Sequence, residues 1–280
     1  MNKALELFRI SRPINCIITF ASVWIGAVVA GNIFYSGEIL TASLSGACIA
    51  AFGNIVNDIL DLSVDKINKP NRPLVRGIIS LREARIAAII FGMSGLILSV
   101  WIGFISFLIA AAAISLLVVY TPLLKGIPFA GNLTVALVAA MAFVYGGNAV
   151  GKPFGALILS AYAFLMHLGR EIVKDIEDRL ADMNYGHRTA AMLYNARLSR
   201  LTAIGVFTIL IMATFLPVAT GFYGAGYFLT VLIGTDFFLV ESAHKLAKTN
   251  NEKEMHRIAV WLKVAMPFGL LAVLLGHLGW

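Results

Sequence analysis

The sequence predicts an all-α integral membrane protein whose nine transmembrane helices form one bundle. Two observations lead to this fold class. Hydrophobic residues make up 59% of the 280-residue chain and charged residues only 13%, whereas a soluble domain carries about 25% charged residues. The apolar residues also gather in segments of about 20 residues, which is the length that an α-helix needs to cross the hydrocarbon core of a bilayer. We therefore expect lipid around most of the chain.

Turn residues and charges separate the nine expected spans. Residues 1–13 carry Lys3, Glu6, Arg9 and Arg12, and we interpret them as a short amphipathic lead-in to the first span and not as a removed signal peptide. Glycine, proline and polar runs mark the later boundaries. The spans are expected at residues 13–31, 38–62, 84–102, 104–121, 130–149, 153–174, 199–217, 223–245 and 257–276, in a single domain over residues 1–280.

The distribution of basic residues predicts the orientation. If the N-terminus is cytoplasmic, Lys152 alone of the 22 Lys and Arg residues falls on the outer side. Cytoplasmic loops are enriched in Lys and Arg, so we expect a multi-pass protein of the cell membrane. Its long polar connections, 63–83 and 175–198, then lie on the cytoplasmic side, where we expect the active site. The net charge of +7 has this source. Nucleic-acid binding is not expected, because no basic stripe with interleaved aromatic residues occurs. No protein partner can be inferred.

Two acidic clusters stand at the inner ends of the second and sixth expected spans. At 100° per residue, the members of each cluster share one face of a helix. The first cluster is Asn54, Asp58, Asp61 and Asp65, and the second, 117 residues later (171 minus 54), is Glu171, Asp175, Asp178 and Asp182. The pattern x-I-V-x-D-I-x-D therefore occurs twice, which indicates a weak internal duplication.

The acidic clusters favour binding of Mg²⁺ and phosphate. Carboxylates on one face repel one another unless a cation lies between them, and the C-terminal end of a helix favours positive charge instead. Oxygen ligands of this kind suit Mg²⁺, which commonly binds through carboxylates and substrate phosphates. The loop after the first cluster places Lys69 and Arg72 among prolines that restrict the backbone. We expect these two cations to complete a diphosphate clamp, and the other basic residues of this region to face anionic membrane lipids.

These motifs resemble those of the UbiA-type intramembrane prenyltransferases over essentially the whole chain. Asn57-Asp58-x-x-Asp61-x-x-x-Asp65, followed by Asn71-Arg72-Pro73-Leu74, is similar to the first signature of the family. The second signature resembles Asp178-x-x-x-Asp182-x-x-x-Gly186, and a third family segment resembles the run from Tyr120 to Lys125. Arg12-Pro13 resembles the opening of the family's first helix. The run from Arg170 to Asp178 and the compact length look most like the archaeal digeranylgeranylglyceryl phosphate synthases.

The resemblance implies an activity and a set of roles. The activity is Mg²⁺-dependent transfer of a geranylgeranyl group from geranylgeranyl diphosphate to the hydroxyl of geranylgeranylglyceryl phosphate, through an allylic cation, in ether lipid biosynthesis. The partners are then a prenyl diphosphate donor and a lipid-phosphate acceptor. Two Mg²⁺ ions are expected on Asp58, Asp61, Asp65, Asp178 and Asp182, with Asn54, Asn57 and Asp175 as additional ligands or their supports. Diphosphate is expected at Arg12, Lys69, Arg72, Tyr120 and Lys125, and the acceptor phosphate at Lys174, Arg179 and Arg188.

Three alternatives stay beside this interpretation. An aromatic acceptor, as in quinone or haem biosynthesis, requires the same metal site but no second anion site. A secondary transporter is favoured by the internal repeat. However, the two copies are four spans apart, an even offset that preserves their orientation, and the clusters lie at one face and not at the midplane. A CDP-alcohol phosphotransferase carries its aspartates in one continuous motif, which is absent here. Asp236, in the eighth span, has no obvious partner in the sequence.

Overall fold

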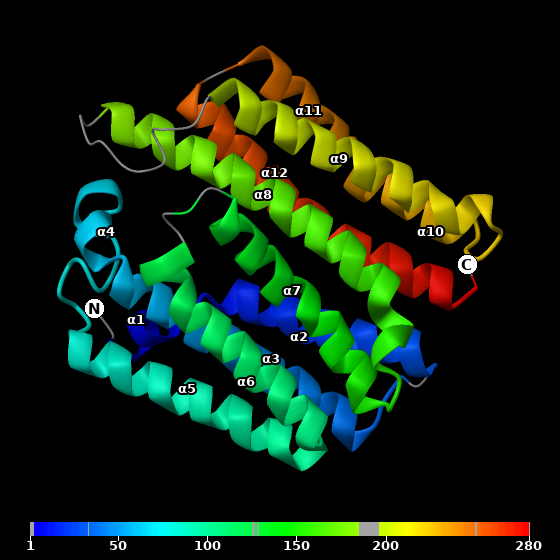
Figure 1. Cartoon of the computed structure of the whole chain (residues 1–280), viewed down its shortest axis with the longest axis horizontal. Helices are drawn as coiled ribbons and strands as arrows, with labels where there is room; N and C mark the ends of the chain where they lie inside the picture. Colours follow the sequence, from blue (N-terminus) through cyan, green and yellow to red (C-terminus); the bar gives the residue numbers. More distant parts are fainter. Residues whose placement is uncertain are drawn as a thin grey trace. The chain divides into compact units, whose positions relative to one another are not determined.

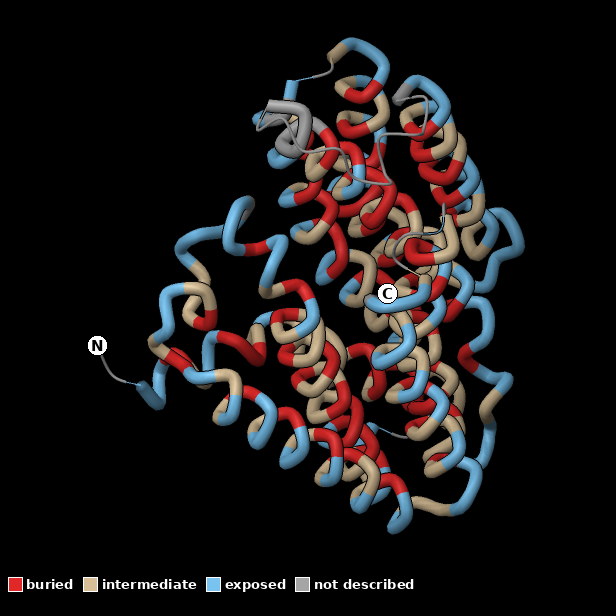
Figure 2. Tube along the Cα trace, turned by 60° about the vertical axis from the view of Figure 1, so that its left-hand side comes forward, coloured by how far each residue is buried: buried red, intermediate tan, exposed pale blue. Residues whose placement is uncertain are grey.

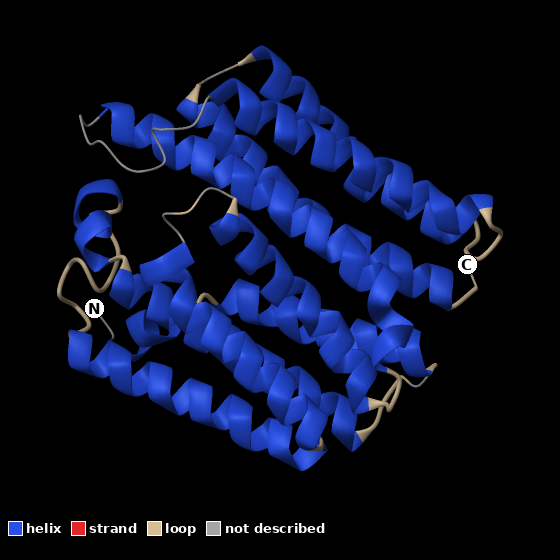
Figure 3. Cartoon of the chain, viewed as in Figure 1, coloured by secondary structure: helices blue, strands red, loops and turns tan. Residues whose placement is uncertain are grey.

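Every regular element that the structure describes is a helix. The computed structural model describes residues 3–32, 34–124, 127, 129–184, 196–249 and 251–279, and no β-strand occurs within these ranges (Figure 3). Eight helical segments among the described residues are long and apolar enough to cross a membrane. The predicted all-α, multi-pass membrane fold is therefore confirmed.

One of the nine expected spans, 104–121, falls on a shorter helix than the others. α6 (Phe104–Val119) has 16 residues, so it extends about 24 Å, less than the roughly 30 Å of a hydrocarbon core. It continues directly into η1 (Tyr120–Leu124), a π-helical segment of 5 residues. This continuity supports the count of nine spans, which stays a prediction.

Contacts between residues divide the chain into two compact units. The first contains Met1–Gly126 and Val138–Ser160, and the second contains Ile127–Leu137 and Ala161–Trp280. Helices of the first unit are α1 (Lys3–Ile10), α2 (Pro13–Gly31), α3 (Gly37–Leu60), α4 (Leu62–Asn68), α5 (Leu81–Ile102), α6, η1, the later part of α7 (Ala130–Ala149), η2 (Pro153–Ala156) and the first residues of α8 (Leu157–Asn184). The second holds the start of α7, most of α8, α9 (Ala196–Ala219), α10 (Ala225–Val231), η4 (Leu232–Asp236), α11 (Phe237–Lys248) and α12 (Glu252–His277) (Figure 1).

In the first unit, α3 packs against α2, α5 and α6. A buried chain of hydrogen bonds joins α3 and α5 to α7: Tyr145 of α7 donates its hydroxyl to Ser45 of α3 at 2.8 Å, and Ser45 donates to the carbonyl of Gly95 in α5 at 2.8 Å. Inside a membrane, a hydroxyl must find its partner within the protein. The chain therefore fixes α3, α5 and α7 relative to one another.

A close crossing of α2 and α7 depends on two glycines. A Cβ atom at Gly146 would lie 1.9 Å from the carbonyl oxygen of Val23, and one at Gly26 would lie 2.4 Å from that of Phe143. Small residues that let two backbones approach are typical of helix pairs in membranes. The two glycines therefore serve close packing between helices.

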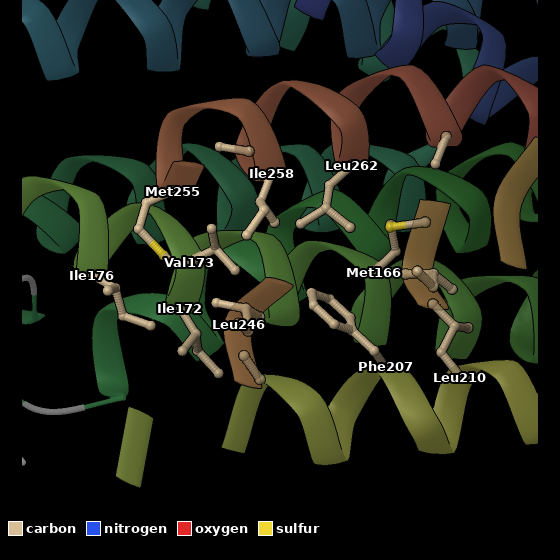
Figure 4. Close-up of a cluster of buried hydrophobic side chains, with 14 of the residues drawn as sticks. Met166, Ile172, Val173, Ile176, Phe207, Leu210, Leu246, Met255, Ile258 and Leu262 are labelled. Carbon is tan, nitrogen blue, oxygen red and sulfur yellow. The ribbon is translucent and has the colours of Figure 1, made fainter. Parts of the chain in front are cut away.

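The core of the second unit is a cluster of buried apolar side chains from α8, α9, α11 and α12. Figure 4 shows them pointing toward one another, with Phe207 of α9 and Leu246 of α11 near the centre. Phe207 reaches the backbone of Gly169 in α8, where a Cβ atom would lie 2.3 Å from its ring. This core holds α8, which carries the second acidic cluster.

Large apolar side chains cover the outside of both units. Trp101, Phe104 and Phe154 are each more than 70% exposed, at 78%, 73% and 80%. Figure 2 shows buried and exposed residues alternating along the helices, as expected when one side of a helix packs on its neighbours and the other faces lipid. An apolar surface of this extent requires a bilayer as its solvent.

Candidate functional site

The first acidic cluster lies where α3 ends and α4 begins. Asp58, Asp61 and Asp65 are all buried, with 6%, 7% and 4% of their surface exposed. The sequence predicted one continuous helical face, but the helix is interrupted at Asp61, whose ψ of 3° departs from helical geometry. Asp65 therefore belongs to α4, and its place beside Asp58 depends on contacts from elsewhere in the chain.

Two arginines supply those contacts. Arg72 donates from Nη1 to Asp58 Oδ1 at 2.9 Å and also to Asp65 Oδ2, so one guanidinium joins the two carboxylates. Arg12 donates from Nη2 to the same Asp58 oxygen at 2.5 Å. In the sequence analysis, we expected both arginines to bind diphosphate beside this cluster. The carboxylates bind two guanidinium groups of the kind that also binds diphosphate.

Backbone geometry directs Arg12 toward Asp58. Arg12 is in the left-handed region (φ 54°, ψ 71°) at the start of α2, directly before Pro13. This conformation costs a residue other than glycine about 1–2 kcal/mol, so the surrounding structure must hold it. Asn54 of α3 contributes, because its side chain donates to the carbonyl of Ser11 at 2.9 Å. Asn54 therefore fixes the turn that carries Arg12.

The loop that carries Arg72 is anchored by apolar contacts. Leu74 and Ile79 are buried and pack in one cluster with Ile10 of α1 and Ile55 of α3. Lys69, at the end of α4, is exposed and acts electrostatically on Asp65. We predicted that cations of the loop 66–77 lie beside the first acidic cluster. The position of Arg72 is consistent with this prediction.

Electrostatics around Asp65 favour a cation. Burial raises the pKa of the Asp65 carboxyl above its ordinary value, Arg72 and Lys69 oppose this rise, and the neighbouring Asp61 and Asp58 add to it. Within the described ranges, no three His, Cys, Asp or Glu groups are arranged to hold a metal ion. The donor set nevertheless fits Mg²⁺, which needs only one or two carboxylates when phosphate and water supply the remaining oxygens.

The second acidic cluster lies on α8, which runs as one helix through residue 184. Asp175 accepts a hydrogen bond of 2.8 Å from the side-chain amide of Asn132, in the first turn of α7. Glu171 is buried and binds Arg170 and Lys174. Asp178 is half-buried. Asp182 belongs to α8, but its side chain lies outside the described part of the chain, as do Lys125 and Arg188.

The remaining predicted residues fall in different settings. Asn57 lies in the last turn of α3, where its carbonyl accepts the backbone N–H of Asp61 at 2.9 Å. Tyr120 is half-buried at the start of η1. Arg179 is buried and donates from Nη2 to Ser199 of α9 at 2.7 Å and from Nε to the carbonyl of Asp175 at 3.2 Å. Arg179 therefore holds α8 against α9.

Sequence reasoning missed Asn132 and Arg170 as members of the site. Asn132 is 43 residues from Asp175, and no motif connects the two positions. Arg170 carried a weak signal, because it precedes Glu171 directly and another cation follows three residues after that carboxylate. The first acidic cluster belongs to the first unit and the second acidic cluster to the second unit.

Comparisons with known proteins agree with these motifs. The model of the UbiA prenyltransferase family matches residues 18–266. A digeranylgeranylglyceryl phosphate synthase of Thermococcus sibiricus is 35% identical over 270 residues, covering 96% of each chain. A solved structure of a digeranylgeranylglyceryl phosphate synthase aligns over 99% of both chains, with a TM-score of 0.76 and 29% identity. A UbiA homologue of Archaeoglobus fulgidus, bound to GPP and Mg²⁺, shares the fold with a TM-score of 0.66 at 21% identity over 97% of this chain and 99% of its own. The chain therefore belongs to the UbiA prenyltransferase family.

Proposed function

We propose that this chain transfers a geranylgeranyl group from geranylgeranyl diphosphate to the hydroxyl of geranylgeranylglyceryl phosphate. The observation that carries the proposal is the pairing of Asp58 and Asp65 with Arg12 and Arg72. Carboxylates that suit Mg²⁺, beside arginines that suit phosphate, are the parts required to bind a prenyl diphosphate. The name of the Thermococcus sibiricus relative supports this donor and acceptor.

The carboxylates Asp58, Asp61, Asp65, Asp178 and Asp182 would hold Mg²⁺, with Asn54, Asn57 and Asp175 as additional ligands or supports. Bound Mg²⁺ neutralises the negative charge of the departing diphosphate. Until substrate arrives, Arg12 and Arg72 compensate the charge of the first cluster. When diphosphate binds, the guanidinium groups of Arg12 and Arg72 would donate to phosphate oxygens in place of the carboxylates. Lys69, Tyr120 and Lys125 would bind the same diphosphate.

The bond changes define what the protein must do. The bond between the allylic carbon and the diphosphate oxygen breaks, and its electron pair leaves with diphosphate. The acceptor hydroxyl oxygen then bonds to the allylic carbon, forms an ether and loses its proton. Fixed positive charge near the leaving group lowers the barrier because it needs no reorganisation during the reaction. The apolar helices exclude water, which would otherwise capture the allylic cation.

The topology that fits this function has nine spans and a cytoplasmic N-terminus. Lys152 is then the one basic residue of the 22 on the outer side, which is the asymmetry expected of a protein in the cell membrane. Both acidic clusters would open toward the cytoplasm, where water-soluble Mg²⁺ is available. The two units would then form one catalytic domain.

The test is a product assay with purified protein in detergent. Geranylgeranyl diphosphate and Mg²⁺ are incubated with either geranylgeranylglyceryl phosphate or 4-hydroxybenzoate, and Asp58→Asn and Asp178→Asn are assayed in parallel. We expect an ether with the glycerophosphate that both variants fail to form. A prenylated benzoate in its place would move the function to the aromatic acceptors. If neither mixture released diphosphate, both acceptor assignments would be wrong and a transport function would be favoured.

A further inference from the structure

Two cations of α8, a helix labelled in Figure 1, bind one buried carboxylate of the same helix in the second unit. Arg170 donates from Nη1 to Glu171 Oε1 at 3.0 Å, and Lys174 donates from Nζ to Glu171 Oε2 at 2.8 Å. Glu171 is only 7% exposed, whereas the side chains of Arg170 and Lys174 are 21% and 37% exposed. The two positive side chains are therefore more exposed than the buried carboxylate that they bind.

This group has more positive charge than Glu171 needs. One cation is enough to neutralise one carboxylate, so these three residues together carry a net charge of +1, which Asp175 partly offsets at Lys174. The Nε atom of Arg170 is moreover buried and has no hydrogen-bond partner among the described residues. A buried N–H without an acceptor is unfavourable, and a guanidinium has five such donors. An anionic ligand would balance the positive charge of the two cations and supply the acceptor that Arg170 Nε lacks within the described part of the chain.

Neighbouring groups that the structure describes leave the Nε atom of Arg170 without an acceptor. The carboxylate of Asp175 acts electrostatically on Lys174. His167, one turn earlier on α8, is neutral or positive. Asp175, one turn later, accepts its hydrogen bond from Asn132. Arg179, which the sequence assigned to the acceptor phosphate, is bound instead to Ser199 and to the backbone of Asp175.

The position of the group along α8 matches the size of the acceptor. Lys174 precedes Asp178 by four residues, a distance of about 6 Å along the helix axis. In a glycerol phosphate lipid, one three-carbon unit carries both the phosphate and the reacting hydroxyl, so the two are only a few ångströms apart. A phosphate bound at Arg170 and Lys174 therefore leaves the hydroxyl near the carboxylates where diphosphate would depart.

We infer that Arg170 and Lys174 bind the phosphate of the lipid acceptor, with Glu171 positioning both cations. This inference rests on the proposed function, and it replaces Arg179 with Arg170 in the predicted acceptor site. It also gives a basis for choosing a phosphorylated acceptor over 4-hydroxybenzoate, because a phosphate accepts hydrogen bonds from both cations through several oxygens, whereas the benzoate carries a single carboxylate.

The experiment measures steady-state kinetics of wild type, Arg170→Gln and Lys174→Gln with each substrate varied in turn. Loss of one charge-assisted hydrogen bond should raise the KM for geranylgeranylglyceryl phosphate about 10-fold to 100-fold, while the KM for geranylgeranyl diphosphate stays unchanged. The wild type should use geranylgeranylglycerol, which lacks the phosphate, far less well than the phosphorylated acceptor. In the variants this preference should shrink, whereas a merely structural defect would lower both activities equally.

Arg257→Gln is the matched control, because Arg257 of α12 also pairs with a glutamate, Glu254, at 2.8 Å. It should leave both KM values unchanged. Arg170→Lys keeps a charge beside Glu171 but loses the planar fork, so it should fold and raise the acceptor KM several-fold. An active wild type with an unchanged acceptor KM in all three α8 variants would overturn the inference. A wild type that forms no ether would instead overturn the proposed function.

Discussion

The substitution Asp58→Asn removes one negative charge from the first acidic cluster and keeps the size and shape of the side chain. Asp58 Oδ1 accepts hydrogen bonds from both Arg12 and Arg72, at 2.5 and 2.9 Å. Each such bond to a charged acceptor contributes about 1.5–3 kcal/mol, and a neutral acceptor gives roughly half of that. Weakening two bonds should therefore lower the free energy of unfolding by about 1–3 kcal/mol, since reduced repulsion from Asp61 and Asp65 offsets part of the loss.

The effect on catalysis should exceed the effect on stability. Removing one preorganised electrostatic group commonly lowers kcat by about 100-fold to 1,000-fold. We expect a decrease of this size for Asp58→Asn, with a higher Mg²⁺ concentration needed for half the maximal rate. The assay is diphosphate release per folded molecule over a Mg²⁺ titration, with the folded fraction measured by thermal unfolding in the same detergent.

Glu6→Gln is the control for this substitution. Glu6 is also a buried carboxylate of the first unit, 3% exposed, and it pairs with Arg9 at 2.6 Å, but it lies outside the acidic cluster. It should change stability slightly and leave the Mg²⁺ dependence as in wild type. The reasoning is refuted if Asp58→Asn keeps the wild-type kcat and Mg²⁺ titration, or if Glu6→Gln loses activity to the same extent.

Four further substitutions test the helix packing and the buried hydrogen bonds. Gly146→Ala places a methyl group 1.9 Å from a backbone oxygen of α2, so thermal unfolding should show destabilisation of about 1–3 kcal/mol or more. Gly205→Ala, in open space on α9, should be neutral or slightly stabilising, and the opposite order of the two would contradict the packing argument. Thr214→Val removes the hydroxyl that contacts Asp236 at 3.1 Å and should lower the free energy of unfolding by about 1–3 kcal/mol. Activity per folded molecule should not change, and a specific loss of kcat would give that carboxylate a catalytic role. Asn132→Ala removes the donor to Asp175 of the second acidic cluster, so it should lower the free energy of unfolding by about 1–3 kcal/mol. Initial rates per folded molecule should show a kcat about 10-fold lower, and an unchanged kcat would remove Asn132 from the site.

Composition and periodicity alone predicted the membrane fold and the acidic residues of the candidate site. Both are local properties: a span needs about 20 apolar residues in sequence, and residues that share a helical face repeat every three or four positions. The motifs around Asp58 and Asp178 were recognisable for the same reason. Arg12 and Asp58 are 46 residues apart, so no local pattern connects them. Only the family resemblance led us to expect Arg12 at this site.

Only the tertiary structure decided which groups meet across helices. Asp236 had no partner in the sequence and binds Thr214, 22 residues away. Asn132 was missed because its contact with Asp175 depends on how α7 and α8 pack, and Arg179 was assigned to phosphate although it holds α9. Each of these contacts joins segments far apart in the chain, and packing of apolar side chains decides their distance. A single sequence records which side chains are present, and the fold determines which of them find partners in a membrane interior without water.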